Sequence, residues 1–193
     1  MNKNVMKSAA FVLAASAIFF STGCGGEAGS SMATPKKKLS VAVEASYAPF
    51  EYKDEDGHII GFDVDLMKAV AQKMDAEAEF NNLPFEQIFH FVGDKKIQLG
   101  ISAIGATEER KKHVSFSDPY YSLGSYVIVV RPGTEGIHGP EDLKGRIVVA
   151  ERGTTNEMKV KELSPARTVM PDYYKDVFKA VEEGEASGCS YRG

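Results

Sequence analysis

Strand-like runs alternate with amphipathic stretches along most of this chain, and this alternation limits the fold more than any other feature. Runs of strand character occur at residues 39–43, 76–82, 97–104, 125–133, 146–150 and 167–171. Between them, apolar residues fall at helical spacing in 63–74, 85–96 and 173–184, while 107–114 indicates a short helix capped by Thr107 and 151–163 a turn followed by a helix. Strands that alternate with helices predict an α/β fold in which helices cover parallel sheets.

Within this pattern, the sequence also indicates some local features. Residues 47–63 indicate a loop with a small hairpin that turns at 54–57, and Asp63 is expected to cap the helix that follows. Along that helix Leu66, Met67, Val70, Ala71 and Met74 share helical spacing. In folds of this kind, ligands bind beyond the carboxyl ends of the strands. Three loops fit that position, at residues 44–51, 102–110 and 151–155.

The first residues are typical of an export signal. Lys3 and Lys7 precede an uncharged stretch, 8–20, which is too short to span a membrane comfortably. The stretch ends in "STGC", which resembles the bacterial lipobox, although Ser21 stands where that motif usually has an aliphatic residue. We therefore expect a signal peptide at 1–23, lipid on Cys24 and a flexible tether at 24–38. The alternative is an ordinary signal cleaved nearby.

Composition narrows the classes of function. The chain is 43% hydrophobic and 26% charged, as globular domains are, and its net charge of −4 gives no reason to expect nucleic-acid binding. Its two cysteines, Cys24 and Cys189, leave no intrachain disulfide if Cys24 is acylated. The four histidines lack metal-ligand spacing, so no metal or cofactor is expected. A monomer is the expected state.

Several motifs in order resemble one known family. They are "YAPFEY", "GFDVDLMKAVA", "FEQIF", "GISAIGATEERKKHVSFSDPYY" and "LKGRIVVAERGTT". The chain resembles the polar amino acid-binding proteins of bacterial ABC importers, the family 3 extracellular solute-binding proteins. The resemblance implies a type II periplasmic-binding-protein fold, with lobe one at 39–128, lobe two at 129–193 and a hinge between them. It also implies a free amino acid as ligand, permease subunits as partners, and a place in the periplasm or at the cell surface.

The site residues begin with the anion-binding groups. Arg110 lies in the first turn of a helix beyond the third strand, where a guanidinium can hold a carboxylate through two hydrogen bonds. The alternative is a solvated surface arginine. Thr154 and Thr155 precede a helix whose N–H groups can hold the same carboxylate, although an ordinary helix cap would look alike. The resemblance implies that all three bind the ligand's α-carboxylate.

The remaining site residues follow from the resemblance. Ser102 and Gly105 match ligand-binding positions, with Gly105 in place of a residue that is often Ser or Thr. Tyr47 and Phe85 match positions whose rings enclose the ligand side chain, and either ring alone would also suit a core. Glu44 matches a position where an acid reaches a cationic side chain, which favours lysine, arginine, ornithine or histidine. The alternative for Glu44 is a loop carboxylate facing water.

The end of the sequence departs from the family. The last residues, "SGCSYRG", do not follow the apolar strand pattern expected there, so we expect a C-terminal truncation. Lobe two would then lack a strand, and the return to lobe one would be incomplete. Apart from a binding protein, the alternatives are a cyclohexadienyl dehydratase-like enzyme on the same scaffold, the sensor domain of a receptor kinase or lytic transglycosylase, and a non-functional fragment.

Overall fold

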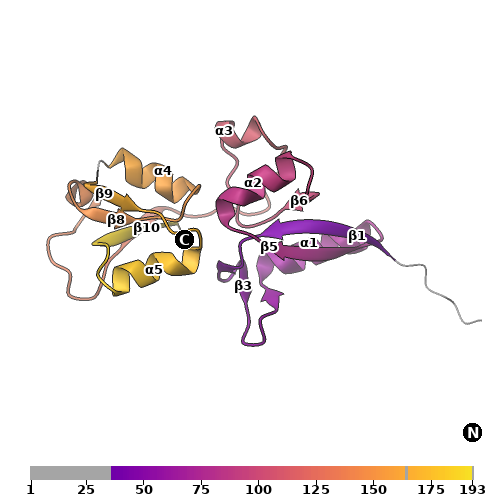
Figure 1. Ribbon diagram of the computed structural model, residues 1–193, viewed down its shortest axis with the longest axis horizontal. Helices are drawn as coiled ribbons and strands as arrows, with labels where there is room; N and C mark the ends of the chain where they lie inside the picture. The colour runs from indigo at the N-terminus through magenta and orange to yellow at the C-terminus, as the bar shows by residue number, and fades with distance from the viewer. Residues whose placement is uncertain (1–35, 164, 193) are drawn as a thin grey trace, which may run out of the picture. The chain divides into compact units, whose positions relative to one another are not determined.

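Two separate sheets, each covered by helices, organise the part of the chain that the computed structural model describes, which is residues 36–163 and 165–192. The N-terminal sheet has the strand order β5-β1-β6 and the C-terminal sheet has the order β7-β10-β8-β9 (Figure 1). A small antiparallel sheet, β2-β3-β4, is inserted after β1. The predicted α/β class is confirmed. The division into lobes at residue 128 stays a prediction.

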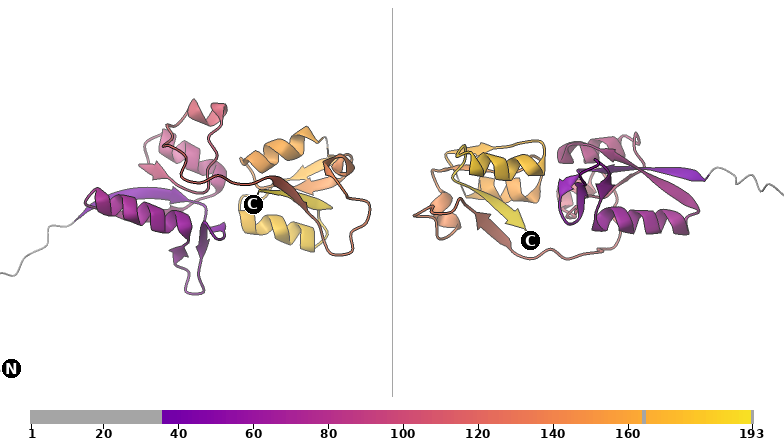
Figure 2. Two further views of the ribbon diagram at one scale, coloured as in Figure 1. Left: turned by 180° about the vertical axis from the view of Figure 1, so that it is seen from behind. Right: turned by 90° about the horizontal axis from the view of Figure 1, so that it is seen from below.

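The N-terminal sheet is parallel throughout. Strand β1 (Lys37–Val43) pairs along its full length with β5 (Ala76–Asn82) and, on its other side, with β6 (Leu99–Gly100). Helices α1 (Phe62–Lys73) and α2 (Phe85–Gly93) pack on opposite faces of this sheet (Figure 2). Successive β1 side chains point to opposite faces, so that Val41 packs with the α1 core and Ala42 with the α2 core.

The inserted sheet is the hairpin that the sequence predicts, with one short strand added. Strand β3 (Glu51–Lys53) pairs with β2 (Ser46–Tyr47) and with β4 (Ile59–Ile60). The turn between β3 and β4 closes with a 3.0 Å hydrogen bond from the N–H of Gly57 to the carbonyl of Asp54.

Two predictions about α1 are wrong. The helix begins at Phe62, so Asp63 lies inside it rather than capping it, and the N-cap residue is Gly61. Asp63 turns its carboxylate inward instead, to the N–H of Ala103 and the hydroxyl of Tyr120. Val70 and Met74 are exposed because the inward face of α1 is narrower than the predicted stripe, and Met74 follows the last helical turn.

The C-terminal sheet is mixed. Strand β8 (Ile147–Val149) pairs in parallel with β9 (Arg167–Val169) and with β10 (Gly188–Arg192), and β10 pairs antiparallel with β7 (Tyr126–Val129). Helices α4 (Thr155–Glu162) and α5 (Tyr174–Glu182) pack on its two faces, with Val160 in one core and Val177 in the other. Two short helices, α3 (Glu108–Lys111) and the 3₁₀ helix η1 (Pro140–Leu143), complete the fold.

Strand β10 contradicts the expectation that the last residues form no strand. It lies inside the sheet, between β7 and β8. Cys189 and Tyr191 pack toward the core under α5, while the intervening Ser190 is buried on the other side. Alternate side chains of this segment are therefore buried on opposite faces of the sheet, as in a strand, although the segment is not a run of aliphatic residues. Within the described residues, no helix combines the length and apolarity needed to cross a membrane.

Candidate functional site

A pocket lies where the carboxyl ends of β1, β6 and β8 and the beginnings of α4 and α5 come together. It encloses about 460 Å³, counting the part open to solvent. All eight residues predicted for ligand binding line it: Glu44, Tyr47, Phe85, Ser102, Gly105, Arg110, Thr154 and Thr155. Six further residues complete the lining: Glu51, Ala103, Leu123, Glu151, Asn156 and Tyr174. The structure thus brings the three predicted loops to one place.

Arg110 is held in place on several sides. The backbone N–H of Arg110 donates to the side-chain hydroxyl of Thr107 at 3.2 Å, and Thr107 thereby caps α3 as predicted. One guanidinium nitrogen donates to the carbonyl of Gly105 at 2.7 Å, and the other donates to the carbonyl of Gly153 at 2.8 Å. The neighbouring Lys111 is exposed and pairs with Glu108, as a solvated surface cation does.

The environment of Arg110 is apolar as well as polar. Its guanidinium lies 4.6 Å from the ring centroid of Phe89 and 5.2 Å from that of Phe85. Burial lowers the pKa of Arg110 to about 10, which still leaves it cationic at neutral pH. A guanidinium has five N–H donors, and the two carbonyls engage only part of them. The two carbonyl bonds therefore hold Arg110 as a fixed cation at the pocket wall, and its remaining donors are free of these bonds, in contrast to a solvated surface arginine.

Ser102 is a structural link as well as a pocket residue. Its hydroxyl donates to Glu51 at 2.8 Å and accepts the N–H of Glu44 at 3.1 Å. These two bonds use its only donor, so Ser102 can offer a ligand no more than an acceptor. At Gly105, an added Cβ would meet only ordinary contacts at 3.9 Å, from Arg110 and Thr155. A side chain would fit at this position, and because glycine has none, that space belongs to the pocket.

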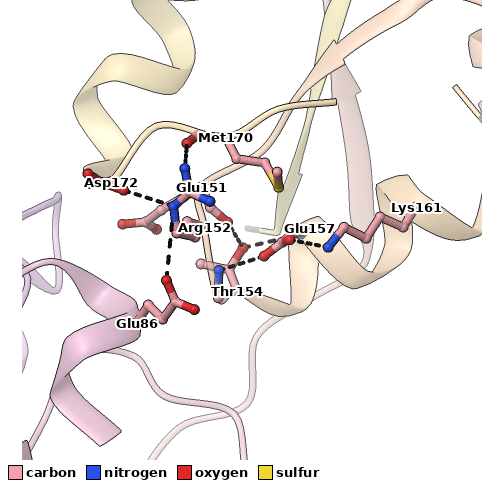
Figure 3. A network of polar contacts seen from close by, with 9 residues as sticks. Glu86, Glu151, Arg152, Thr154, Glu157, Lys161, Met170 and Asp172 are labelled. Atoms are coloured by element: carbon pink, nitrogen blue, oxygen red, sulfur yellow. Dashed lines mark hydrogen bonds and ion pairs between the residues drawn. The ribbon is translucent and has the colours of Figure 1, made fainter. Parts of the chain in front are cut away.

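Thr154 and Thr155 differ in what their hydroxyls do. Thr154 is the N-cap of α4: its hydroxyl accepts the N–H of Glu157 at 3.2 Å and donates to the carbonyl of Glu151 at 2.7 Å (Figure 3). The hydroxyl of Thr154 therefore caps the helix, which is the alternative that the sequence left open for it. The first N–H groups of α4, from Thr155 and Asn156, are donors that a helix leaves without an internal partner.

The two predicted rings have different surroundings. Phe85 is buried beneath Arg110 and meets Phe89 edge-on at 5.6 Å. Tyr47 is half-buried, stacks on Phe50 and meets Tyr174 edge-on with the centroids 4.6 Å apart. Both rings therefore line the pocket and also pack against other side chains, so the pocket position and the core position that the sequence left open both apply.

Glu44 does not face water, contrary to the alternative for it. Only 1% of its surface is exposed, and one carboxylate oxygen accepts the hydroxyl of Ser46 at 2.6 Å. Burial raises the pKa of Glu44 to about 7, against the hydrogen bonds of Ser46 and the charge of Lys175, which lower it. An acid this well buried in a pocket favours a cationic partner.

A second polar network fixes the loop after β8. Arg152 donates to Asp172 at 2.9 Å and to the carbonyl of Met170 at 2.9 Å, and it lies 4.0 Å from Glu86 of α2 (Figure 3). Glu157 accepts the N–H of Gly153 at 2.6 Å and pairs with Lys161. These contacts hold the backbone around Gly153 where its carbonyl meets Arg110.

The sequence reasoning missed several pocket residues. Glu151 falls in a predicted site loop but is not among the predicted ligand-binding residues, and neither are Glu51, Asn156 and Tyr174. The signal available for Glu151 was its position directly after a buried strand, at the start of a predicted site loop. Cys24 lies outside the described residues. Within them, one group has metal-ligand spacing, Asp54, Asp56 and His58 at the tip of the β3–β4 hairpin.

Comparisons with known proteins agree with this geometry. Residues 39–189 match the sequence model of the bacterial extracellular solute-binding proteins, family 3. The arginine-binding extracellular protein ArtP of Bacillus subtilis (strain 168) is 39% identical over 160 residues, which are 83% of this chain and 62% of that protein. The chain thus spans less than two thirds of the length of the curated relatives it matches first.

Solved structures give the same result. An ancestral arginine-binding protein bound to arginine superimposes with a TM-score of 0.76 at 36% identity, covering 82% of this chain and 71% of that one. An ancestral amino acid-binding protein described as a precursor of cyclohexadienyl dehydratase gives a TM-score of 0.75 at 33% identity, covering 80% and 70%. The predicted type II periplasmic-binding-protein fold is confirmed.

Proposed function

Because this chain belongs to family 3 of the bacterial extracellular solute-binding proteins, we propose that it captures a cationic amino acid outside the cytoplasmic membrane and delivers it to the permease of an ABC importer. Several curated relatives are named as arginine- or histidine-binding proteins, which supports this class of ligand. The proposal includes attachment to the membrane through lipid on Cys24.

One observation carries the proposal. The pocket has a fixed cation, Arg110, and three buried acids, of which Glu51 is bound to Ser102, while Glu44 and Glu151 remain for a ligand. A cationic amino acid has the complementary charges, a carboxylate at one end and a positive side chain at the other. Arg110 and the first N–H groups of α4 would hold the carboxylate, while the acids would hold the side chain. Tyr47 and Phe85 would contact the apolar part between these ends.

The test is a titration of the purified protein with L-arginine, L-lysine, L-histidine and L-glutamate by calorimetry. We expect L-arginine to bind and L-glutamate not to bind. Arg110→Ala should weaken binding by at least about a hundredfold, because it removes charge-assisted bonds to the carboxylate, each worth ~1.5–3 kcal/mol. The matched control is Lys111→Ala, one residue along, which removes an exposed cation and should leave affinity unchanged. Equal effects of the two substitutions would contradict the proposal.

A second candidate function is dehydration of a cyclohexadienyl acid. It is favoured by the likeness to the dehydratase precursor and by Glu44, whose pKa of about 7 suits a general acid. Incubation with prephenate and with arogenate, followed by detection of the aromatic product, distinguishes the two. We expect no turnover, because the ring carboxylate that prephenate and arogenate both carry would meet the buried acids Glu44 and Glu151 rather than a cation. Product formation abolished by Glu44→Gln would favour the enzyme instead.

A further inference from the structure

Glu151 is a buried pocket acid with an unsatisfied carboxyl oxygen. Only 4% of its surface is exposed, and its Oε1 has no hydrogen-bond partner among the described residues. A buried carboxyl oxygen without a partner is costly unless the group is protonated or a ligand completes it. The neighbouring Arg152 does not serve it, because its guanidinium is directed to Asp172 and Met170.

Glu151 and Glu44 converge although they come from different sheets. Glu44 directly follows β1, and Glu151 lies two residues beyond β8. Both acids line the pocket together with Tyr174, the first residue of α5, and the charge of Glu44 acts on Glu151. Burial, together with the nearby charge of Glu44, raises the pKa of Glu151 to about 9.

The other charged groups around this pair do not neutralise it. Lys175 is the cation that acts on Glu44, but it is exposed and its amino group lies over the ring of Tyr173 at 5.7 Å. Glu51 adds a further acid close to Glu44, and the hydroxyl of Tyr174 lies near Glu151. Arg110 is directed to the carbonyls of Gly105 and Gly153. Two like charges in such a site are avoided when the pair keeps a proton.

We infer that Glu151 is a second specificity-determining carboxyl, which binds the ligand's cationic side chain together with Glu44, and that the ligand displaces a proton from this pair when it binds. The inference rests on the proposed function. In the empty pocket the proton compensates the paired acids. When a guanidinium or ammonium enters, its positive charge replaces that of the proton, and the proton leaves to solvent. The net charge of the pocket is then the same before and after binding.

This exchange makes affinity depend on pH in a defined direction. Because binding releases a proton, the dissociation constant falls as pH rises, by at most about tenfold per pH unit for one proton. The dependence should lie between about pH 6 and 9, where the two carboxyls titrate. A cation held only by carboxylates that are already ionised would show no such dependence.

The first measurement is calorimetry of L-arginine binding at pH 7 in phosphate and in Tris, which differ strongly in their heat of ionisation. The difference in binding heat gives the number of protons released, and we expect a value close to one. L-citrulline, the uncharged analogue of the same shape, should release none if it binds. Equal heats in the two buffers with L-arginine would overturn the inference and leave the proposed function intact. Absence of binding by any cationic amino acid would overturn both.

The second measurement compares Glu151→Gln with the wild type across pH. At pH 6 a protonated Glu151 resembles glutamine, so the two proteins should bind L-arginine alike. At pH 9 the variant should bind at least about tenfold more weakly, and its proton release at pH 7 should fall by half or more. The control is Glu182→Gln, an exposed acid on α5, which should behave as the wild type. A loss of affinity that is the same at every pH would indicate a structural role only and would contradict the inference.

Discussion

Glu51 and Asp63 show how single residues hold one rim of the pocket together. Both are almost fully buried and act on each other electrostatically, and each has one carboxyl oxygen, Glu51 Oε2 and Asp63 Oδ1, that no donor of the described residues reaches unless one of the two acids is protonated. Asp63 also accepts the N–H of Ala103 at 2.7 Å and the hydroxyl of Tyr120 at 2.8 Å. Burial raises the pKa of both acids, that of Glu51 to about 11, so Glu51 keeps the shared proton and donates it to Asp63.

This arrangement predicts opposite outcomes for two amide substitutions. Glu51→Gln keeps a donor toward Asp63 and should leave the free energy of unfolding unchanged at pH 4.5. Asp63→Asn can keep an oxygen toward Ala103 and Tyr120, but it then turns its amino group toward the proton of Glu51, and this should lower the free energy of unfolding by ~1.5–3 kcal/mol. Denaturant melts check both values, with the exposed Glu55→Gln as a control. Equal losses from both substitutions would show that the proton is not on Glu51.

The same proton predicts how stability depends on pH. Well below pH 4.5, the ordinary pKa of Glu51, the folded and the unfolded chain both have the proton bound. Above it the unfolded chain loses the proton while the folded chain keeps it, so the contribution of Glu51 to stability falls as pH rises toward about 11. Glu51→Gln removes this fall, so its advantage over the wild type should grow between pH 5 and 9, by on the order of 1–3 kcal/mol. A constant difference over that range would argue against a buried protonated acid.

Among the elements, the turn between β8 and α4 is the most demanding. Gly153 has φ of 77°, and a Cβ there would lie 2.9 Å from the Cβ of Glu86 and 3.1 Å from its Cα. The turn therefore depends on glycine twice, for its backbone conformation and for its close approach to α2. Since the guanidinium of Arg110 also donates to the carbonyl of Gly153, this turn connects Arg110 to α4.

Two alanine substitutions distinguish the effect of the positive φ from the effect of the close approach to α2. Gly133 has φ of 78° with nothing within 4 Å of an added Cβ, so Gly133→Ala reports the backbone strain alone. Gly153→Ala adds the clash and should cost ~1–2 kcal/mol more in the free energy of unfolding. It should also weaken L-arginine binding, which Gly133→Ala should not. Melts and calorimetry on both variants check this, and equal losses would mean that the approach to Glu86 is unimportant.

Local patterns predicted the parts of the site whose cause is local. The Thr107 cap and the strand before it place Arg110, and hydrophobic spacing gives α2 and α5. Glu151 was missed as a ligand-binding candidate because its burial depends on where α5 begins, far along the chain. Strand β10 was missed because Cys189, Ser190 and Tyr191 have no strong strand preference together. Its pairing partners on both sides determine its conformation, and these are long-range contacts.

For the whole molecule, Cys189 is a reporter of global stability. Its side chain is fully buried in β10 under α5, and burial raises the pKa of its thiol to about 11. Because the chain has two cysteines, a Cys24→Ser variant leaves this thiol alone to react. Reagents can therefore reach it only when the C-terminal sheet opens.

We expect labelling of Cys189 to slow when ligand stabilises the fold. L-arginine at a hundred times its dissociation constant should add about 2.7 kcal/mol and slow labelling about a hundredfold, if the sheet opens only by global unfolding. Mass spectrometry after timed exposure to a thiol reagent gives the rate, and L-glutamate serves as the control. Slowing much smaller than the measured stabilisation would show that β10 opens locally.

The central place of β10 has a consequence for biosynthesis. A ribosome produces β7, β8 and β9 before the strand that lies between β7 and β8. Until β10 emerges, the facing edges of β7 and β8 have no partner, and the core residues under α5 stay accessible to other molecules. The C-terminal sheet therefore has to be kept from mispairing while the chain grows. Any chaperone that guards the growing chain has to hold these edges longer than those of the N-terminal sheet, whose strands are all made within the first hundred or so residues.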